Sequence, residues 1–137
     1  MTQTMTSNDL NSYYTAVQTI GKLRTPNHAH RWSQATLRTL ALNLDGRTKK
    51  KLANALPKEL AQQLKRQFWL LHFRNKQITR LEFQKMVANR AGNTDAQFAR
   101  HPVTATFHSL KSLIPNEVSQ AVADSLSPEL SEMWQNA

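Results

Sequence analysis

Apolar residues recur at helical spacing through the first half of the chain. Two stripes stand out, one formed by Tyr13, Val17 and Ile20, and a longer one formed by Ala35, Leu37, Leu40 and Leu44. Positions three, four or seven residues apart lie on one face of an α-helix, so each stripe predicts a helix with one buried face. Two shorter helices are expected to follow. Leu52 and Leu56 mark the third, and the fourth begins at Pro57, because proline is tolerated at the first helical position.

The same pattern occurs a second time. Shifting the sequence by seventy residues aligns its two halves without a gap, and almost all of the matching residues are apolar or small. Identical pairs include Val17 with Val87, Ala29 with Ala99, Leu40 with Leu110, Leu56 with Leu126 and Leu60 with Leu130. Conservative pairs lie between them, among them Tyr13 with Phe83, Leu37 with Phe107 and Leu64 with Trp134. A register that never slips predicts two copies of one helical unit.

Helix-start signals mark the second copy. Thr79 and Glu82 have capping-box spacing, in which each side chain accepts a hydrogen bond from the backbone N–H of the other residue. The run Ser127-Pro128-Glu129 supplies a cap residue, a first-turn proline and an acid that suits the helix dipole. We therefore expect an all-α fold of about eight helices, arranged as two tandem four-helix units packed into one domain.

The unit boundaries follow from the repeat and from local polarity. Residues 1–11 are polar and predict a disordered N-terminal tail, residues 12–68 form the first unit, residues 69–78 a connector, and residues 79–135 the second unit. The tail lacks the basic segment and apolar run of a signal peptide. The longest apolar stretch, residues 68–73, is interrupted by His72 and is too short to cross a bilayer.

Composition agrees with the all-α expectation. The chain of 137 residues holds three glycines, five prolines and no cysteine. Few turn-forming residues favour helices over a turn-rich β architecture, and the length suits one domain with a core of its own. Without cysteine, neither a disulfide framework nor a thiolate metal site is available. A cytoplasmic protein is the simplest expectation.

The aligned positions also carry a family resemblance. Ala35-Thr36-Leu37 with Leu40, Leu56-Pro57 before Glu59-Leu60, and the run from Leu81 to Gly92 resemble the bacterial domain-of-unknown-function 2267 family. The second-copy run from Ala105 to Leu130 fits it as well, so the resemblance covers roughly residues 13–134. It implies a tandem helical domain and no established activity. The sequence departs from the family where Leu126-Ser127-Pro128 replaces a second Leu-Pro, and where the connector is more apolar and basic.

Charge is distributed unevenly over the two copies. The formal net charge is +9, and residues 38–90 hold thirteen Lys and Arg against three acids, whereas residues 91–137 hold two against five. The run Arg47-Thr48-Lys49-Lys50-Lys51 corresponds to Glu117-Val118-Ser119-Gln120-Ala121 in the second copy. The fold therefore does not require lysine there. The run also lies at a helix start, where the dipole disfavours each positive charge by about 0.3–1 kcal/mol.

These cations and the connector aromatics are the candidate binding residues. The predicted basic face comprises Arg47, Lys49, Lys50, Lys51, Lys58, Lys65 and Arg66, and the predicted connector contacts comprise Trp69, Phe73, Arg74 and Lys76. The alternative interpretation is that the Lys and Arg side chains of the basic face are solvated and only confer solubility. The connector aromatics are more typical of the core between the units, and only joint exposure of Trp69 and Phe73 would indicate a docking patch.

Residues for catalysis or metal binding are sparse. His28 and His30 flank Ala29 without a nearby acid or cysteine, which is weak support for a metal site. Glu129 with Glu132 has helical spacing and is most simply a solvated face. Phosphate-loop, dinucleotide and nucleophile-elbow motifs are missing from the sequence. We therefore expect that the protein is not an enzyme and that it binds neither a cofactor nor a metal.

Two functional hypotheses remain. The first is a scaffold or adaptor whose basic face and connector bind an acidic protein or assembly, or let the chain associate with itself through the oppositely charged second unit. The second is a non-specific binder of nucleic acid or of an anionic membrane surface that uses the cluster at 49–51. No recognition-helix signature or single-strand-binding aromatic motif supports the second.

Overall fold

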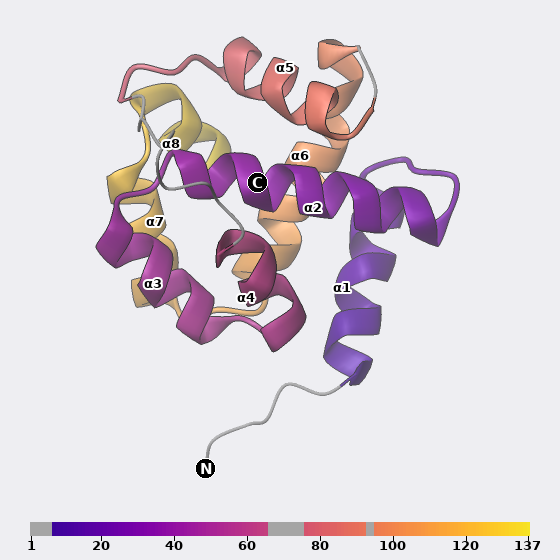
Figure 1. Ribbon diagram of the computed structural model, residues 1–137, viewed down its shortest axis with the longest axis horizontal. Coiled ribbons are helices and arrows are strands. Elements are labelled where there is room, and N and C mark those ends of the chain that lie inside the picture. Colours follow the sequence, from indigo (N-terminus) through magenta and orange to yellow (C-terminus); the bar gives the residue numbers. More distant parts are fainter. Residues whose placement is uncertain (1–6, 66–75, 93–94) are drawn as a thin grey trace.

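The computed structural model describes residues 7–65, 76–92 and 95–137, and within these ranges the chain forms eight α-helices and no strand. The expected all-α fold class is confirmed. The helices are α1 (Ser7–Ile20), α2 (Pro26–Leu42), α3 (Gly46–Ala55), α4 (Lys58–Lys65), α5 (Arg80–Arg90), α6 (Ala96–Lys111), α7 (Asn116–Ser125) and α8 (Pro128–Asn136) (Figure 1). None of these helices is long and apolar enough to cross a membrane.

The seventy-residue offset of the sequence recurs in the helix bounds. α3 and α7 begin and end seventy residues apart, and α2 and α6 begin seventy residues apart. Side-chain burial follows the same offset, since Val17 and Val87 are both fully buried, as are Leu37 and Phe107. Thr36 and Thr106 are also fully buried, and each hydroxyl donates to the carbonyl four residues earlier. The sequence repeat is therefore a repeat of core positions.

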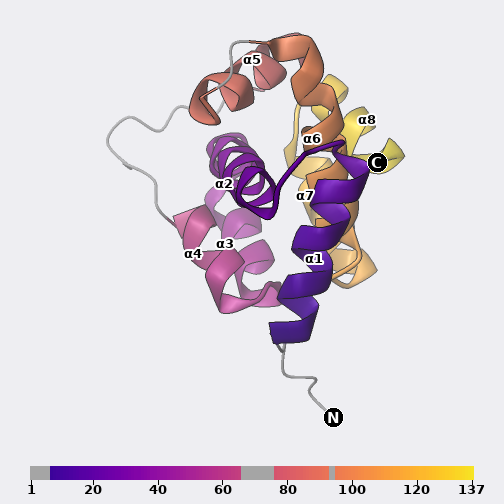
Figure 2. The same cartoon turned by 90° about the vertical axis from the view of Figure 1, so that its right-hand side faces the viewer.

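The first two helices of each copy pack reciprocally. α1 contacts α2 and also α6, while α5 contacts α6 and also α2. Figure 2 shows α5 lying across one end of the molecule beside α2, with α1 on another side against α6. α2 contacts its own equivalent α6, and α3 contacts its equivalent α7. Interchanging the two copies turns these contacts into one another.

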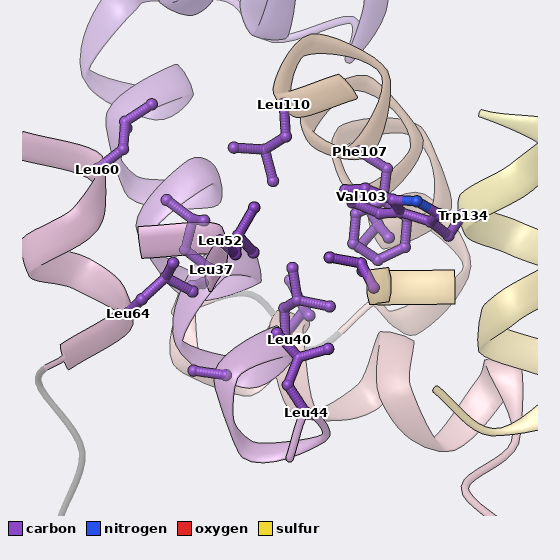
Figure 3. Close-up of a cluster of buried hydrophobic side chains, with 14 of the residues drawn as sticks. Leu37, Leu40, Leu44, Leu52, Leu60, Leu64, Val103, Phe107, Leu110 and Trp134 are labelled. Atoms are coloured by element: carbon purple, nitrogen blue, oxygen red, sulfur yellow. The ribbon is translucent and has the colours of Figure 1, made fainter. Parts of the chain in front are cut away.

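The core lies between helices of both copies (Figure 3). Leu37 and Leu40 come from α2, Leu64 from α4, Phe107 from α6 and Trp134 from α8. All five are exposed by 1 % or less. The rings of the last two pack edge to face with centroids 5.2 Å apart. The indole N–H of α8 also donates to the Ser119 hydroxyl at 3.1 Å, so its one polar group is satisfied inside the core.

Hydrogen bonds from side chains start several helices. The capping box of α5 is present, because Thr79 and Glu82 each accept from the other's backbone N–H. Ser127 caps α8 with Pro128 in the first turn, as predicted. Pro57 differs from the expectation, because it lies before α4 and its carbonyl accepts the Ala61 N–H. It therefore precedes the helix rather than opening it.

The first helix begins earlier than the sequence predicted. α1 starts at Ser7, inside the span 1–11 that the polar composition assigned to a tail. Asp9 lies in its first turn, where an acid suits the helix dipole. Polarity alone does not separate an exposed first helical turn from a coil, because both present polar side chains to water.

Two serine hydroxyls fix helix ends, and one of them joins the two copies. The Ser125 hydroxyl at the end of α7 accepts the Asp45 backbone N–H at 2.9 Å and lies 3.1 Å from the same residue's carboxylate. The Ser127 hydroxyl donates to the Ile78 carbonyl at 2.8 Å, just before α5. Both serines are buried. The start of α3 is thereby fixed to the end of α7, and the start of α5 to the start of α8.

Candidate functional site

The predicted basic face begins on α3. This helix buries Thr48, Leu52 and Ala53, and its opposite side therefore faces solvent. Arg47, Lys50 and Lys51 stand at i, i+3 and i+4, which places them side by side on that exposed face. Lys49, one position away, is half-buried.

The unfavourable position of these cations is partly offset by a residue that the sequence analysis did not single out. Asp45 caps α3, and its carboxylate accepts the Thr48 N–H at 2.7 Å. A negative charge at a helix start opposes the positive end of the dipole and stabilises the helix by about 0.3–1 kcal/mol. The second copy has Pro115 at this position and no side-chain cap. The signal for the Asp45 cap in the sequence was an Asp directly before Gly46.

α4 extends the cationic face. It buries Leu60, Ala61 and Leu64, and exposes Lys58 and Lys65 at its two ends. α3 and α4 pack against each other (Figure 1). We call the described cations on these two adjacent helices the basic surface: Arg47, Lys49, Lys50, Lys51, Lys58 and Lys65.

The acid on α4 makes a contact of its own. The Tyr14 hydroxyl donates to the Glu59 carboxylate at 3.0 Å, and the same ring stacks on His30 with centroids 3.6 Å apart. Burial and the neighbouring carboxylate raise the pKa of Tyr14 well above its ordinary value, so the phenol keeps its proton. Glu59 is therefore held toward α1 by this contact.

Four predicted contact residues, Arg66, Trp69, Phe73 and Arg74, lie outside the described residues. Lys76 is described and is exposed in the turn before α5. The described residues therefore include the cations of α3 and α4 from the predicted basic face, and Lys76 from the predicted connector contacts.

The second copy exposes acids on the corresponding helices. Exposed residues of α7 include Glu117 and Asp124, and those of α8 include Glu129 and Glu132. The Gln120 side chain donates to Asp124 at 2.8 Å. α7 begins and ends seventy residues after α3, and α8 begins seventy residues after α4. Val118, Val122 and Ala123 of α7 are buried like their equivalents in α3, and Leu130 and Trp134 of α8 are buried like theirs in α4. The charge is therefore a property of each surface and not of the shared fold.

A second group of cations, which the sequence analysis missed, surrounds a cavity of about 430 Å³ beside the turn between α1 and α2. Lys22, Arg24 and Arg31 line it together with the aromatic rings of Trp32 and Phe98. The three cations are separated in the sequence by uncharged residues, and one of the rings comes from the other copy. Only the folded chain brings them together.

A neighbouring cavity of about 420 Å³ is less uniform in charge. Arg100 and His101 line it together with Glu132 and the exposed Ile20. Partial burial, together with the charges of Lys22 and Arg100, lowers the pKa of His101 below its ordinary value. This cavity mixes both signs of charge with apolar side chains.

The fold is all-α, and helix starts and buried positions in the described residues repeat at an offset of seventy. Residues 11–136 match the model of a family described as an uncharacterized conserved protein (DUF2267), and the chain belongs to this family. The resemblance seen in the sequence is thereby confirmed. A comparison with curated proteins finds no match. Family membership agrees with the fold and assigns no activity.

Proposed function

We propose that the protein is a non-enzymatic interaction protein that binds an acidic protein or assembly through the basic surface. The observation that carries the proposal is the contrast between the copies. α3 and α7 have equivalent bounds and share three buried positions, yet the exposed Arg47, Lys50 and Lys51 of α3 are replaced in α7 by one acid and two uncharged residues. Since the fold accepts either charge, the cations of α3 are free to serve a partner.

The geometry of α3 supports a contact with an extended acidic surface. Arg47, Lys50 and Lys51 point away from the core along one helix face, and α4 continues the charge with Lys58 and Lys65. Separate exposed ion pairs contribute only about 0–1 kcal/mol each. A row of cations instead speeds encounter with an oppositely charged partner and fixes its orientation.

The experiment is an affinity capture under mild salt with a matched pair of variants. Lys50→Gln with Lys51→Ala installs the second copy's residues on the basic surface. Lys85→Gln with Arg90→Gln removes the same charge from exposed positions of α5. We expect partners recovered by the native protein and by the α5 variant to be lost with the α3 variant. Equal recovery by all three proteins would remove the basic surface from the proposal.

Salt dependence separates an acidic protein from a nucleic acid. Duplex DNA binding driven by phosphate neutralisation gives a linear log–log plot whose slope falls by about 0.9 for each lost contact. The two α3 substitutions would then lower the slope by about 2. Titrations of the protein with duplex DNA and with an acidic polypeptide, over a range of salt concentrations, compare the two ligands. Tighter binding to DNA with this change in slope would refute the proposal in favour of a nucleic-acid binder.

A further inference from the structure

The cavity beside the α1–α2 turn is cationic. Lys22, Arg24 and Arg31 line it, His28 stands with them, and no carboxylate is among its lining residues in the described part of the chain. Like charges around one cavity repel one another, because each pair adds Coulomb energy that solvent only partly screens. Neither solubility nor packing requires three cations to converge here.

Within the described residues, these cations have no acidic partner. Lys22, Arg24 and Arg31 are all exposed, and none of them makes an ion pair with any residue in the described ranges. The charge of Lys22 also acts beyond the cavity, where it contributes with burial to lowering the pKa of His101. An anion bound among the three cations would relieve their mutual repulsion.

The backbone at Lys22 gives a second and independent argument. Lys22 has φ +58°, in the left-handed region, and its equivalent Gly92 has φ +81°. Both residues follow the last turn of the first helix of their copy, where a left-handed residue ends the helix and glycine is the favoured choice. The second copy has that glycine. The first copy keeps a lysine in a conformation that costs an L-residue about 1–2 kcal/mol.

Aromatic side chains form the other part of the lining. The rings of Trp32 and Phe98 are tilted against each other with centroids 5.8 Å apart. The indole is 4 % exposed and belongs to the core, while the phenyl ring is half-buried. The cavity therefore combines cations with an apolar wall to which a flat group can pack.

The cations and Trp32 come from one copy, and Gly92 and Phe98 come from the other. Lys22 and Gly92 are equivalent positions, as are His28 and Phe98, and all four line the same cavity. The cavity thus lies where the two copies meet. One copy supplies the cations and the other supplies backbone and a phenyl ring, so a ligand would be bound in one orientation.

We propose that this cavity binds a small phosphorylated ligand with a flat aromatic part, of the chemical class of a mononucleotide. Its phosphates would lie among Lys22, Arg24 and Arg31, and its aromatic part would lie toward Phe98. The volume falls within the roughly 300–1,000 Å³ typical of small-molecule sites. Guanidinium groups suit phosphate because they donate two parallel hydrogen bonds. The proposal is independent of the basic surface of α3 and α4.

The test is isothermal titration of the full chain with ADP, pyrophosphate and adenosine as separate probes. We expect ADP to bind more tightly than pyrophosphate, and adenosine to bind weakly or not at all. Lys22→Gly installs the second copy's residue and removes one charged contact, which should weaken ADP binding about tenfold. Phe98→Leu keeps an apolar side chain of similar size and should weaken ADP while leaving pyrophosphate unchanged.

The α3 variant, Lys50→Gln with Lys51→Ala, is the matched control because it removes two positive charges and neither residue lines the cavity. We expect it to bind ADP like the native protein. Two results would overturn the proposal. One is no heat of binding for ADP or pyrophosphate at low ionic strength, and the other is an equal affinity of the native protein and a folded Lys22→Gly variant for ADP. Equal binding of ADP and pyrophosphate would refute the role of the aromatic wall.

Discussion

Replacing Lys22 by glycine should stabilise the fold. The residue adopts φ +58°, which costs an L-amino acid about 1–2 kcal/mol relative to the right-handed region. Glycine removes this cost but loses more backbone entropy on folding, by about 0.5–1 kcal/mol. The side chain is exposed, and the charged groups that line the cavity with it in the described part of the chain are cations. The net gain in the free energy of unfolding is about 1 kcal/mol, which corresponds to a rise in Tm of about 3 °C.

The second copy supplies a control of opposite sign. Gly92 has φ +81°, and a Cβ built there meets no other atom within 4 Å. Gly92→Ala therefore adds conformational strain without steric overlap and should lower the free energy of unfolding by about 1 kcal/mol. Urea unfolding followed by far-UV circular dichroism measures both variants. A Lys22→Gly variant that is less stable than the native protein would refute the strain argument, and with it the idea that the lysine is kept at a cost.

Three further predictions concern contacts between the copies. Gly21→Ala should cost about 1–3 kcal/mol in thermal or urea unfolding, because the added Cβ would collide with the Val17 carbonyl and lie 3.2 Å from the α6 backbone; native-like stability would contradict this close approach. Ser125→Ala installs the residue of the first unit, Ala55, and should lower the free energy of unfolding by about 1–2 kcal/mol, because the Asp45 N–H loses its acceptor. A loss below about 0.5 kcal/mol would show that another group accepts this N–H. Lys22→Gly should raise the pKa of His101 toward 6.5, as followed by NMR titration, and an unchanged pKa would contradict the electrostatic contact.

The sign of the histidine effect on stability follows from linkage. Because the folded protein holds the pKa of His101 below 6.5, the unfolded chain binds the proton more readily. Its contribution to stability is present above pH 6.5 and is lost as the pH falls toward the lowered pKa. Since Lys22→Gly relieves part of the lowering, it should reduce this loss on the acid side.

Much of the fold was predictable because the repeat doubles the information in the sequence. Leu64 alone is an ordinary apolar residue, but its alignment with Trp134 indicates a position that requires a large buried side chain, and both are fully buried or nearly so. The capping box at Thr79 was equally readable, because its two side chains are three residues apart. Patterns confined to one helix turn or one register need no tertiary information.

The remaining features depend on contacts between distant parts of the chain. The lysines of α3 are consecutive in the sequence and were found as a candidate surface. Lys22 and Phe98 belong to different copies and meet only after folding. The one local signal was the alignment of Lys22 with Gly92. This alignment indicates a strained lysine only when the φ angles of both residues are known. Pairwise alignment of the copies could have raised the question but not answered it.

The reciprocal packing of α1 on α6 and of α5 on α2 has the form of a homodimer whose subunits have been joined into one chain. In a homodimer, any change at the symmetry axis appears twice, so a cavity on the axis must present the same groups from both sides. Joining the subunits removes that restriction. Lys22 and Gly92 stand at equivalent positions and both line the cavity, so its two sides carry different groups. A single chain of this form can therefore present different chemistry to the two ends of a ligand.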